Sequence, residues 1–123
     1  MRFLLLNGAE DSRWRIILAE ALEPLGPLSV VQASQGLPPG EGLDCIIIVD
    51  ATGVEEVEKL VSSLRTEGPE RRIVVMTASP TWTRARAAFE AGAIDYLPKT
   101  LPPEMLRGAF EQIARRELPP WPR

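Results

Sequence analysis

The sequence predicts an α/β domain, in which a doubly wound parallel sheet of five strands carries helices on both faces and so forms three layers. Two observations lead to this prediction. Short runs rich in Leu, Ile and Val, the composition of strands buried on both sides, recur along the 123 residues. Segments with apolar residues at helical spacing lie between most of them. Such alternation of strand and helix is typical of parallel sheets with right-handed crossovers.

The first part of the chain is expected to hold two strands with one helix between them. Residues 2–6 form the first predicted strand and residues 28–33 the second. The helix, residues 13–25, has Asp11 or Ser12 as its candidate cap. The residues expected on its inner face are Ile16, Ile17, Ala21 and Leu22.

The segment after the second strand is unsuited to a regular helix. Residues 34–42 contain two prolines and three glycines, which would interrupt helical hydrogen bonding repeatedly. We therefore expect a loop here, so that the second helix of the fold is short or missing.

Three more strands and three helices are expected in the rest of the chain. The strands are predicted at residues 43–49, 72–76 and 93–97, where apolar residues are concentrated. Helices are predicted after each of these strands, with Gly or Pro near their ends. The residues expected on their inner faces are, in chain order, Val54, Val57, Leu60, Val61 and Leu64, then Ala85, Ala88 and Phe89, then Met105, Leu106, Ala109, Phe110 and Ile113.

Polar residues close three of the apolar runs: Asp50, Thr77 and Lys99. The carboxyl ends of parallel strands meet at one edge, where open α/β sheets bind their ligands. A carboxylate, a hydroxyl and an ammonium that converge there suit a phosphorylated aspartate, because the hydroxyl and the ammonium stabilise the phosphoryl group. Taken one by one, each residue also has an ordinary explanation. Asp50, for example, begins a segment with good turn chemistry.

With the strands placed, the sequence resembles the receiver domain of two-component response regulators over nearly the whole chain. The most specific stretches are Ile-Val-Val-Met-Thr-Ala (residues 73–78) and Ala-Ala-Phe-Glu-Ala-Gly-Ala-Ile-Asp-Tyr-Leu-Pro-Lys (residues 87–99). The resemblance implies a flavodoxin-like sheet with strand order 2-1-3-4-5. It also implies roles for the site residues: Asp50 as the phosphoacceptor, Thr77 and Lys99 as phosphate-binding residues, and Tyr96 as the switch residue.

The sequence departs from the receiver pattern at the metal site. Receivers place an acidic pair after the first strand, where it holds a divalent cation, whereas this chain has Asn7 and Gly8 there. Aligning the first helix instead brings Glu10, or Asp11, to the metal-ligating position beside Asp50. Both acids are also explained as favourable charges at the helix N-terminus. The resemblance thus implies Mg²⁺ as the cofactor, while the missing pair argues against it.

Other departures concern the neighbours of the acceptor and of the lysine. Asp44 lies six residues before Asp50 rather than the usual five, and no Met-Pro pair follows the acceptor. Lys99 is preceded by proline and followed by Thr100, so that the Lys-Pro cis bond common in receivers is absent. These features mark a divergent member.

Composition excludes several classes of site and partner. With no histidine and one cysteine, His-dependent triads and zinc sites are ruled out, and Cys45 is interpreted as a small buried apolar residue. A net charge of -3 without a basic stretch argues against direct binding of nucleic acid. No apolar stretch reaches membrane-spanning length, so we expect no membrane partner and a cytoplasmic location. Residues 1–117 are expected to form the receiver-like domain and residues 118–123 a proline-rich tail.

Three functional hypotheses follow. The first is a pseudo-receiver in two-component phosphorelay signalling, not an enzyme, which acts through protein–protein interaction with impaired Mg²⁺-dependent phosphorylation of Asp50. The second is a working phosphoacceptor that uses Glu10 or Asp11 as a metal ligand. In both, the partner is a histidine kinase or another signalling protein, and a homodimer through the face of the fourth and fifth strands is an additional expectation. The third is a small flavin- or nucleotide-binding enzyme, which needs a phosphate-cradling loop that residues 7–12 do not resemble.

Overall fold

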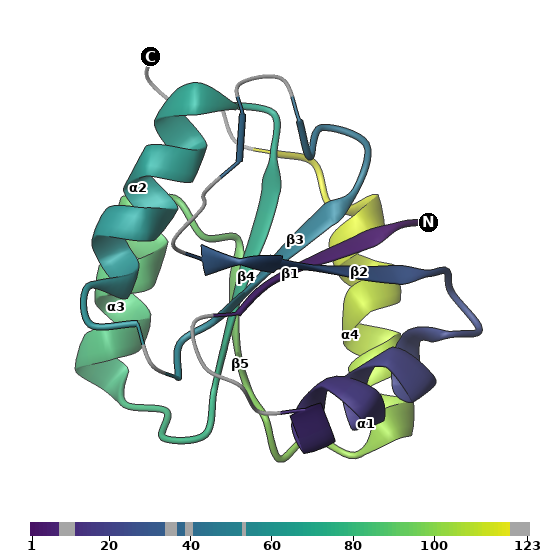
Figure 1. Ribbon diagram of the computed structural model, residues 1–123. Helices are drawn as coiled ribbons and strands as arrows, with labels where there is room; N and C mark the ends of the chain where they lie inside the picture. Colours follow the sequence, from purple (N-terminus) through teal and green to yellow (C-terminus); the bar gives the residue numbers. More distant parts are fainter. Residues whose placement is uncertain (8–11, 34–36, 39–40, 53, 119–123) are drawn as a thin grey trace.

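The computed structural model describes residues 1–7, 12–33, 37–38, 41–52 and 54–118 (Figure 1). Five parallel strands form one sheet in the order β2-β1-β3-β4-β5, as predicted. The elements are β1 (Phe3–Asn7), α1 (Ser12–Leu22), β2 (Leu28–Gln32), β3 (Ile46–Asp50), α2 (Val57–Glu67), β4 (Arg72–Thr77), α3 (Trp82–Ala91), β5 (Asp95–Pro98) and α4 (Pro103–Arg115). Within the described ranges, no helix is both long and apolar enough to cross a bilayer.

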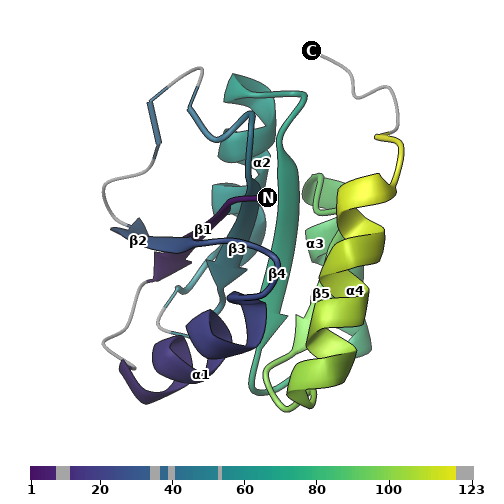
Figure 2. The same ribbon diagram turned by 90° about the vertical axis from the view of Figure 1, so that its right-hand side faces the viewer.

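The helices form two layers, one on each face of the sheet. Helices α1 and α4 pack together on one face, and α2 and α3 on the other (Figure 2). Strand β3, in the middle of the sheet, is buried along its whole length. Its residues alternate between the two layers: Ile46 and Ile48 join the α1–α4 core, and Ile47 and Val49 join the α2–α3 core. This double burial is the physical reason for the unbroken apolar run.

Several predicted helix faces are wrong in part. Ile16 and Ile17 of α1 are 57% and 50% exposed, whereas Leu18, Ala21 and Leu22 are buried. A helix on one face of a sheet buries a single stripe, and at 100° per residue the stripe through Leu18 and Leu22 leaves both isoleucines outside it. The prediction fails in the same way at Phe89 of α3 and Met105 of α4, which are 43% and 58% exposed.

The third strand begins later than predicted. Leu43 lies in a turn and is 47% exposed, and β3 starts only at Ile46. Pairing sets this start, because the Ile46 N–H donates to the Arg2 carbonyl oxygen at the point where β1 begins. The neighbouring side chains of Arg2 and Asp44 form an exposed ion pair of 2.9 Å.

The connection from β2 to β3 contains no α-helix among its described residues, as predicted. Its conformation depends on Arg71, which is completely buried. The Arg71 guanidinium donates to the carbonyl oxygens of Pro38 and Glu41 in the connection, at 2.9 and 2.8 Å, and to that of Leu64 in α2, at 3.0 Å. Leu37, 7% exposed, contributes the apolar contact to the α2–α3 core. One buried guanidinium thus ties Pro38 and Glu41 of the connection to the end of α2.

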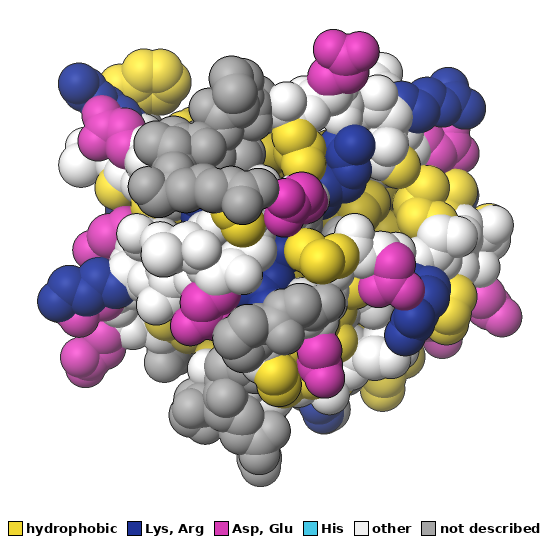
Figure 3. All heavy atoms as spheres, turned by 90° about the horizontal axis from the view of Figure 1, so that it is seen from above, with side chains coloured by type: hydrophobic (Ala, Val, Ile, Leu, Met, Phe, Trp, Pro, Cys, Tyr) yellow, Lys and Arg dark blue, Asp and Glu magenta, His cyan; other side chains and the backbone are white. Residues whose placement is uncertain are grey.

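A second buried arginine lies next to the first. Arg65 of α2 donates to the carbonyl oxygens of Gly92, Pro69 and Arg71. Burial, and next the charge of Arg71, lower the pKa of Arg65 to about 10. Both arginines bind carbonyl oxygens at the end of the sheet where the strands begin. Figure 3 looks onto that end, where acidic and basic side chains of the described residues are interspersed.

Candidate functional site

Asp50 is the last residue of β3 and lies at the carboxyl edge of the sheet. In the sheet register it is flanked by Asn7, the last residue of β1, and by Met76 of β4. Its side chain is completely buried. The position at the end of a central parallel strand is where such sheets present their ligand-binding groups. Asp50 is therefore placed as the sequence predicts, except that it ends the strand instead of following it.

Lys99 contacts Asp50 directly. Its ammonium nitrogen lies 2.7 Å from Oδ1 of Asp50 and 2.9 Å from the hydroxyl oxygen of Thr52. The lysine side chain is only 8% exposed. The Thr52 backbone N–H donates to the same Oδ1 at 2.9 Å. A buried charge is tolerated when it is paired and hydrogen-bonded, and the Oδ1 side of this carboxylate meets both conditions.

The remaining oxygen of Asp50 has a different environment. Oδ2 is buried and has no hydrogen-bond partner within the part of the chain that the structure describes. Because an unpaired buried acceptor is costly, native proteins satisfy nearly all such atoms. Oδ2 is thus a buried acceptor whose bonding the described residues leave incomplete.

Thr77 is the last residue of β4 and lies next to Asp50. Among the hydrogen bonds of the described residues, none joins the Thr77 hydroxyl to the Asp50 carboxylate. Its hydroxyl oxygen accepts a 3.2 Å bond from the Ser79 backbone N–H, and its carbonyl oxygen accepts a 2.8 Å bond from the Lys99 backbone N–H. The second bond aligns the ends of β4 and β5. The structure therefore brings Thr77 to the edge of the Asp50–Lys99 pair, with its hydroxyl oriented by the following turn.

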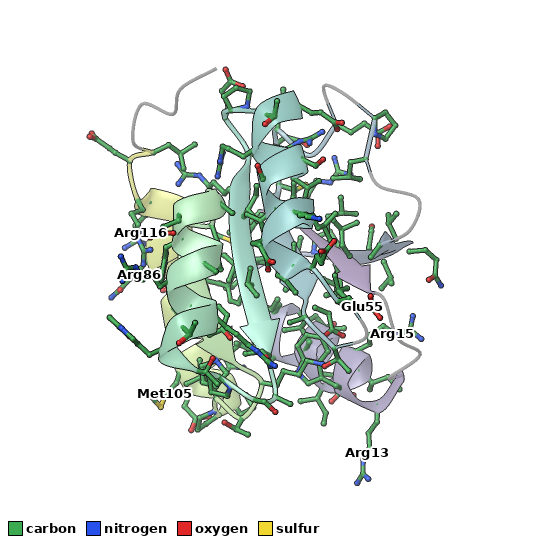
Figure 4. The ribbon with its side chains drawn as sticks, turned by 90° about the vertical axis from the view of Figure 1, so that its left-hand side faces the viewer. Arg13, Arg15, Glu55, Arg86, Met105 and Arg116 are labelled. Carbon is green, nitrogen blue, oxygen red and sulfur yellow. The ribbon has the colours of Figure 1, made fainter. Side chains whose placement is uncertain are left out.

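A groove of about 480 Å³ opens beside Thr77, between the first turns of α2 and α3. Tyr96 of β5, half-buried, lines it together with Thr52 and Thr77. Glu55, which precedes α2, and Arg84 of α3 contribute charged groups of opposite sign. Figure 4 shows α2 and α3 side by side over this face of the sheet, with Glu55 and Arg15 projecting on the side of α1. The predicted switch residue thus shares a groove with the predicted phosphate-binding hydroxyl.

The described residues supply few ligands for a metal ion. They contain no group of three or more His, Cys, Asp or Glu side chains that could hold one. Glu10 and Asp11, the predicted metal ligands, lie outside the described residues. At the carboxyl edge, Oδ2 of Asp50, without a hydrogen-bond partner among the described residues, suits a divalent cation, which would need further oxygen ligands beside this one carboxylate.

Two contacts of Lys99 were not predicted from the sequence. One is the Thr52 hydroxyl, two residues after Asp50, and the other is the indole of Trp14, whose centroid lies 4.1 Å from the lysine nitrogen. A signal for Trp14 was available, because it precedes the buried Leu18 by one helical turn and so shares its face. That face, extended to the start of α1, reaches the carboxyl edge of the sheet.

Comparison with known proteins gives a sequence relative for about half of the chain. No protein-family model matches the sequence. Over 60 residues, 48% of this chain, the sequence is 37% identical to the alginate biosynthesis transcriptional regulatory protein AlgB of Pseudomonas aeruginosa. The match covers 13% of that protein, so this chain spans a small part of its length.

Solved structures match nearly the whole chain. A response regulator from Thermotoga maritima superimposes with a TM-score of 0.74 at 22% identity, covering 94% of this chain and 98% of that one. An orphan response regulator of Helicobacter pylori gives 0.71 at 23% identity, covering 92% and 95%. A protein of Burkholderia pseudomallei described as pilus assembly-related gives 0.77 at 20% identity, covering 94% and 90%. The resemblance to response regulator receiver domains is confirmed in the fold.

Proposed function

We propose that this chain is a receiver-like domain of two-component phosphorelay signalling, which acts through protein–protein interaction and in which Mg²⁺-dependent phosphorylation of Asp50 is impaired. The ion pair between Asp50 and Lys99, at the carboxyl edge of a receiver fold, carries the proposal. A protein of unrelated function on this fold has no need to bury a carboxylate against an ammonium at this edge, because buried ion pairs add little to stability.

The impairment is inferred from the residues after β1. Phosphoryl transfer needs positive charge to offset the oxygens of the transferring group. Where receivers hold acidic metal ligands, this chain has Asn7 and Gly8. Lys99 therefore supplies the positive charge that the described residues place at Asp50. In a phosphorylation step, Oδ2 of Asp50 attacks phosphorus and the bond from phosphorus to the donor breaks.

Oδ2, which has no hydrogen-bond partner among the described residues, favours a second candidate, a fully working phosphoacceptor. In this version Asp50 would hold Mg²⁺ together with Glu10 or Asp11. The ion, when bound, would neutralise charge on the transferring phosphoryl group. Lys99 would keep its place on Oδ1, and the Thr77 hydroxyl would donate a hydrogen bond to a phosphoryl oxygen. The two candidates differ in the metal concentration that the reaction requires.

We further propose that Tyr96 transmits the state of the site to the surface formed by α3, β5 and α4. The groove next to Thr77 offers space for the ring to move when the threonine hydroxyl turns toward a phosphoryl group. The surface carries exposed apolar side chains, Trp82, Phe89 and Met105, which suit a protein partner or a second copy of the chain. Ile16 and Ile17 expose a second apolar area on α1, suited to a phosphodonor protein such as a histidine kinase. This role implies a cytoplasmic location.

The proposal is tested by mass spectrometry of the protein incubated with acetyl phosphate and Mg²⁺. We expect a small fraction of phosphorylated protein that rises with metal concentration and is absent from the Asp50→Asn variant. Stoichiometric phosphorylation at low metal, lost in Glu10→Gln or Asp11→Asn, would instead establish the working phosphoacceptor. A phosphorylated product that persists in Asp50→Asn would contradict both versions.

A further inference from the structure

Trp14 has an unusual position for a core residue of a helix. It lies in the first turn of α1, half-buried, and packs against the core that α1 and α4 share. The same indole presents its ring to the ammonium of Lys99, with 4.1 Å between the nitrogen and the ring centroid. Trp14 therefore connects the core of one layer with the charged pair at the edge of the sheet.

The Lys99 ammonium is enclosed by three different groups. It donates to Oδ1 of Asp50 at 2.7 Å and to the hydroxyl oxygen of Thr52 at 2.9 Å, and the face of Trp14 covers a further side. An ammonium has three donors and no acceptor, so these groups account for its bonding capacity. With only 8% of the side chain exposed, little water competes. A cation over an indole is attracted more strongly when it is desolvated in this way.

We propose that Trp14 is a positioning residue that acts through Lys99. A lysine side chain has a long flexible stem and gains entropy when it swings into solvent. The indole face and the Thr52 hydroxyl oppose that movement and keep the ammonium on Oδ1 of Asp50, so that Oδ2 is the oxygen to which the described residues give no hydrogen bond. The consequence for phosphoryl acceptance rests on the proposed function, whereas the hold on Lys99 does not.

The chain offers a direct test, because Lys59 and Lys99 are its only lysines. The side chain of Lys59 is 72% exposed and serves as an internal reference. An acylating reagent such as sulfo-N-hydroxysuccinimide acetate reaches the Lys99 amine only after the amine has left its enclosure. The ratio of Lys99 to Lys59 acetylation, measured by peptide mass spectrometry without any phosphodonor, reports that equilibrium.

Two substitutions separate the ring face from the packing of Trp14. Trp14→Leu keeps an apolar side chain but removes the aromatic face, and Trp14→Phe keeps a smaller face. We expect the acetylation ratio to rise in Trp14→Leu by roughly two- to thirtyfold, the range of a cation–π contact, and by clearly less in Trp14→Phe. Trp82→Phe, at an indole that is 83% exposed, is the matched control and should leave the ratio unchanged. An equal rise in both Trp14 variants, or no rise in either, would overturn the proposal.

A measurement on the unchanged protein covers the case in which a Trp14 variant fails to fold. Protons above an aromatic ring are shielded, so the NMR resonances at the end of the Lys99 side chain should lie upfield of those of Lys59. Coincident resonances would overturn the proposal. If Asp50 proves not to be phosphorylated in any variant, the proposed function fails while the acetylation ratio still decides the role of Trp14.

Discussion

The Lys99 ammonium reaches from the loop after β5 to within 2.7 Å of Oδ1 of Asp50, whose side chain is completely buried. Removing one partner of such a pair leaves the other as an unpaired buried charge. We expect Lys99→Met to destabilise the protein by about 3–5 kcal/mol at neutral pH. The double variant with Asp50→Asn should lose less than the sum of the single changes. Urea denaturation of the four proteins measures this coupling. Additive losses would show that the two groups do not interact.

Arg71 should be a second point of high sensitivity, at the opposite end of the sheet. Arg71→Met removes three hydrogen bonds and leaves the carbonyl oxygens of Pro38, Glu41 and Leu64 without their buried donor. We expect a loss of about 2–5 kcal/mol in the free energy of unfolding, and faster proteolysis between β2 and β3. Arg86→Met is the matched control, because that side chain is 72% exposed and should change stability by about 0.5 kcal/mol at most. Equal effects of the two substitutions would contradict the assigned role of Arg71.

Substitution by alanine should change stability in opposite directions at Gly92, which ends α3, and at Gly108, which lies inside α4. Gly92 ends α3 with φ of 120°, and a Cβ there would lie 2.9 Å from Cγ of Arg65. Gly92→Ala should therefore cost more than about 1 kcal/mol. Gly108 lies inside α4, where an added Cβ meets no atom within 4 Å. Gly108→Ala should stabilise the protein by about 0.5–1 kcal/mol. Thermal unfolding of both variants tests these expectations, and a stabilised Gly92→Ala would contradict the positive φ and the close approach of Arg65 at this position.

Cys45 should be an unreactive thiol whose ionisation opposes folding at high pH. Burial, and next the charge of Asp44, raise the pKa of the Cys45 thiol. The folded state therefore keeps the thiol proton at pH values where the unfolded chain has lost it. Because ionisation then favours the unfolded chain, the free energy of unfolding falls as pH rises from the unfolded pKa through the folded pKa. Alkylation by iodoacetamide should need higher pH in the folded protein than in urea. Cys45→Ala should weaken the loss of stability at alkaline pH, and identical alkylation profiles with and without urea would refute the assignment.

The fold was predictable because its strands are chemically simple. Buried parallel strands need apolar residues on both faces, so β3 and β4 stand out in the sequence. The prolines and glycines of residues 34–42 likewise predict that no regular helix forms there, and the residues described between β2 and β3 contain none. The helix faces were harder to assign. Ile16 and Ile17 were predicted to be buried because isoleucine is strongly apolar. The sheet, however, contacts only one stripe of α1, and that stripe runs through Leu18.

The positions of the candidate site residues could be predicted where they depend on strand ends, but their contacts with other elements could not. Asp50 and Thr77 are the last residues of β3 and β4, and Lys99 directly follows β5, so the sheet alone brings them to one edge. The contacts of Lys99 with Thr52 and Trp14 also require the direction of a side chain and the height of α1 above the sheet. No periodicity in the sequence reports those distances.

The most direct test of the proposed function restores the acidic pair that receivers carry after the first strand. Beryllofluoride mimics a phosphoryl group on aspartate, and NMR spectra recorded during a Mg²⁺ titration report its binding to Asp50. The double variant Asn7→Asp/Gly8→Asp should respond at markedly lower Mg²⁺ than the unchanged protein. The Asp50→Asn variant should not respond at any concentration. If the unchanged protein responds at the same Mg²⁺ concentration as the double variant, its phosphoacceptor site is not impaired and the central claim is contradicted.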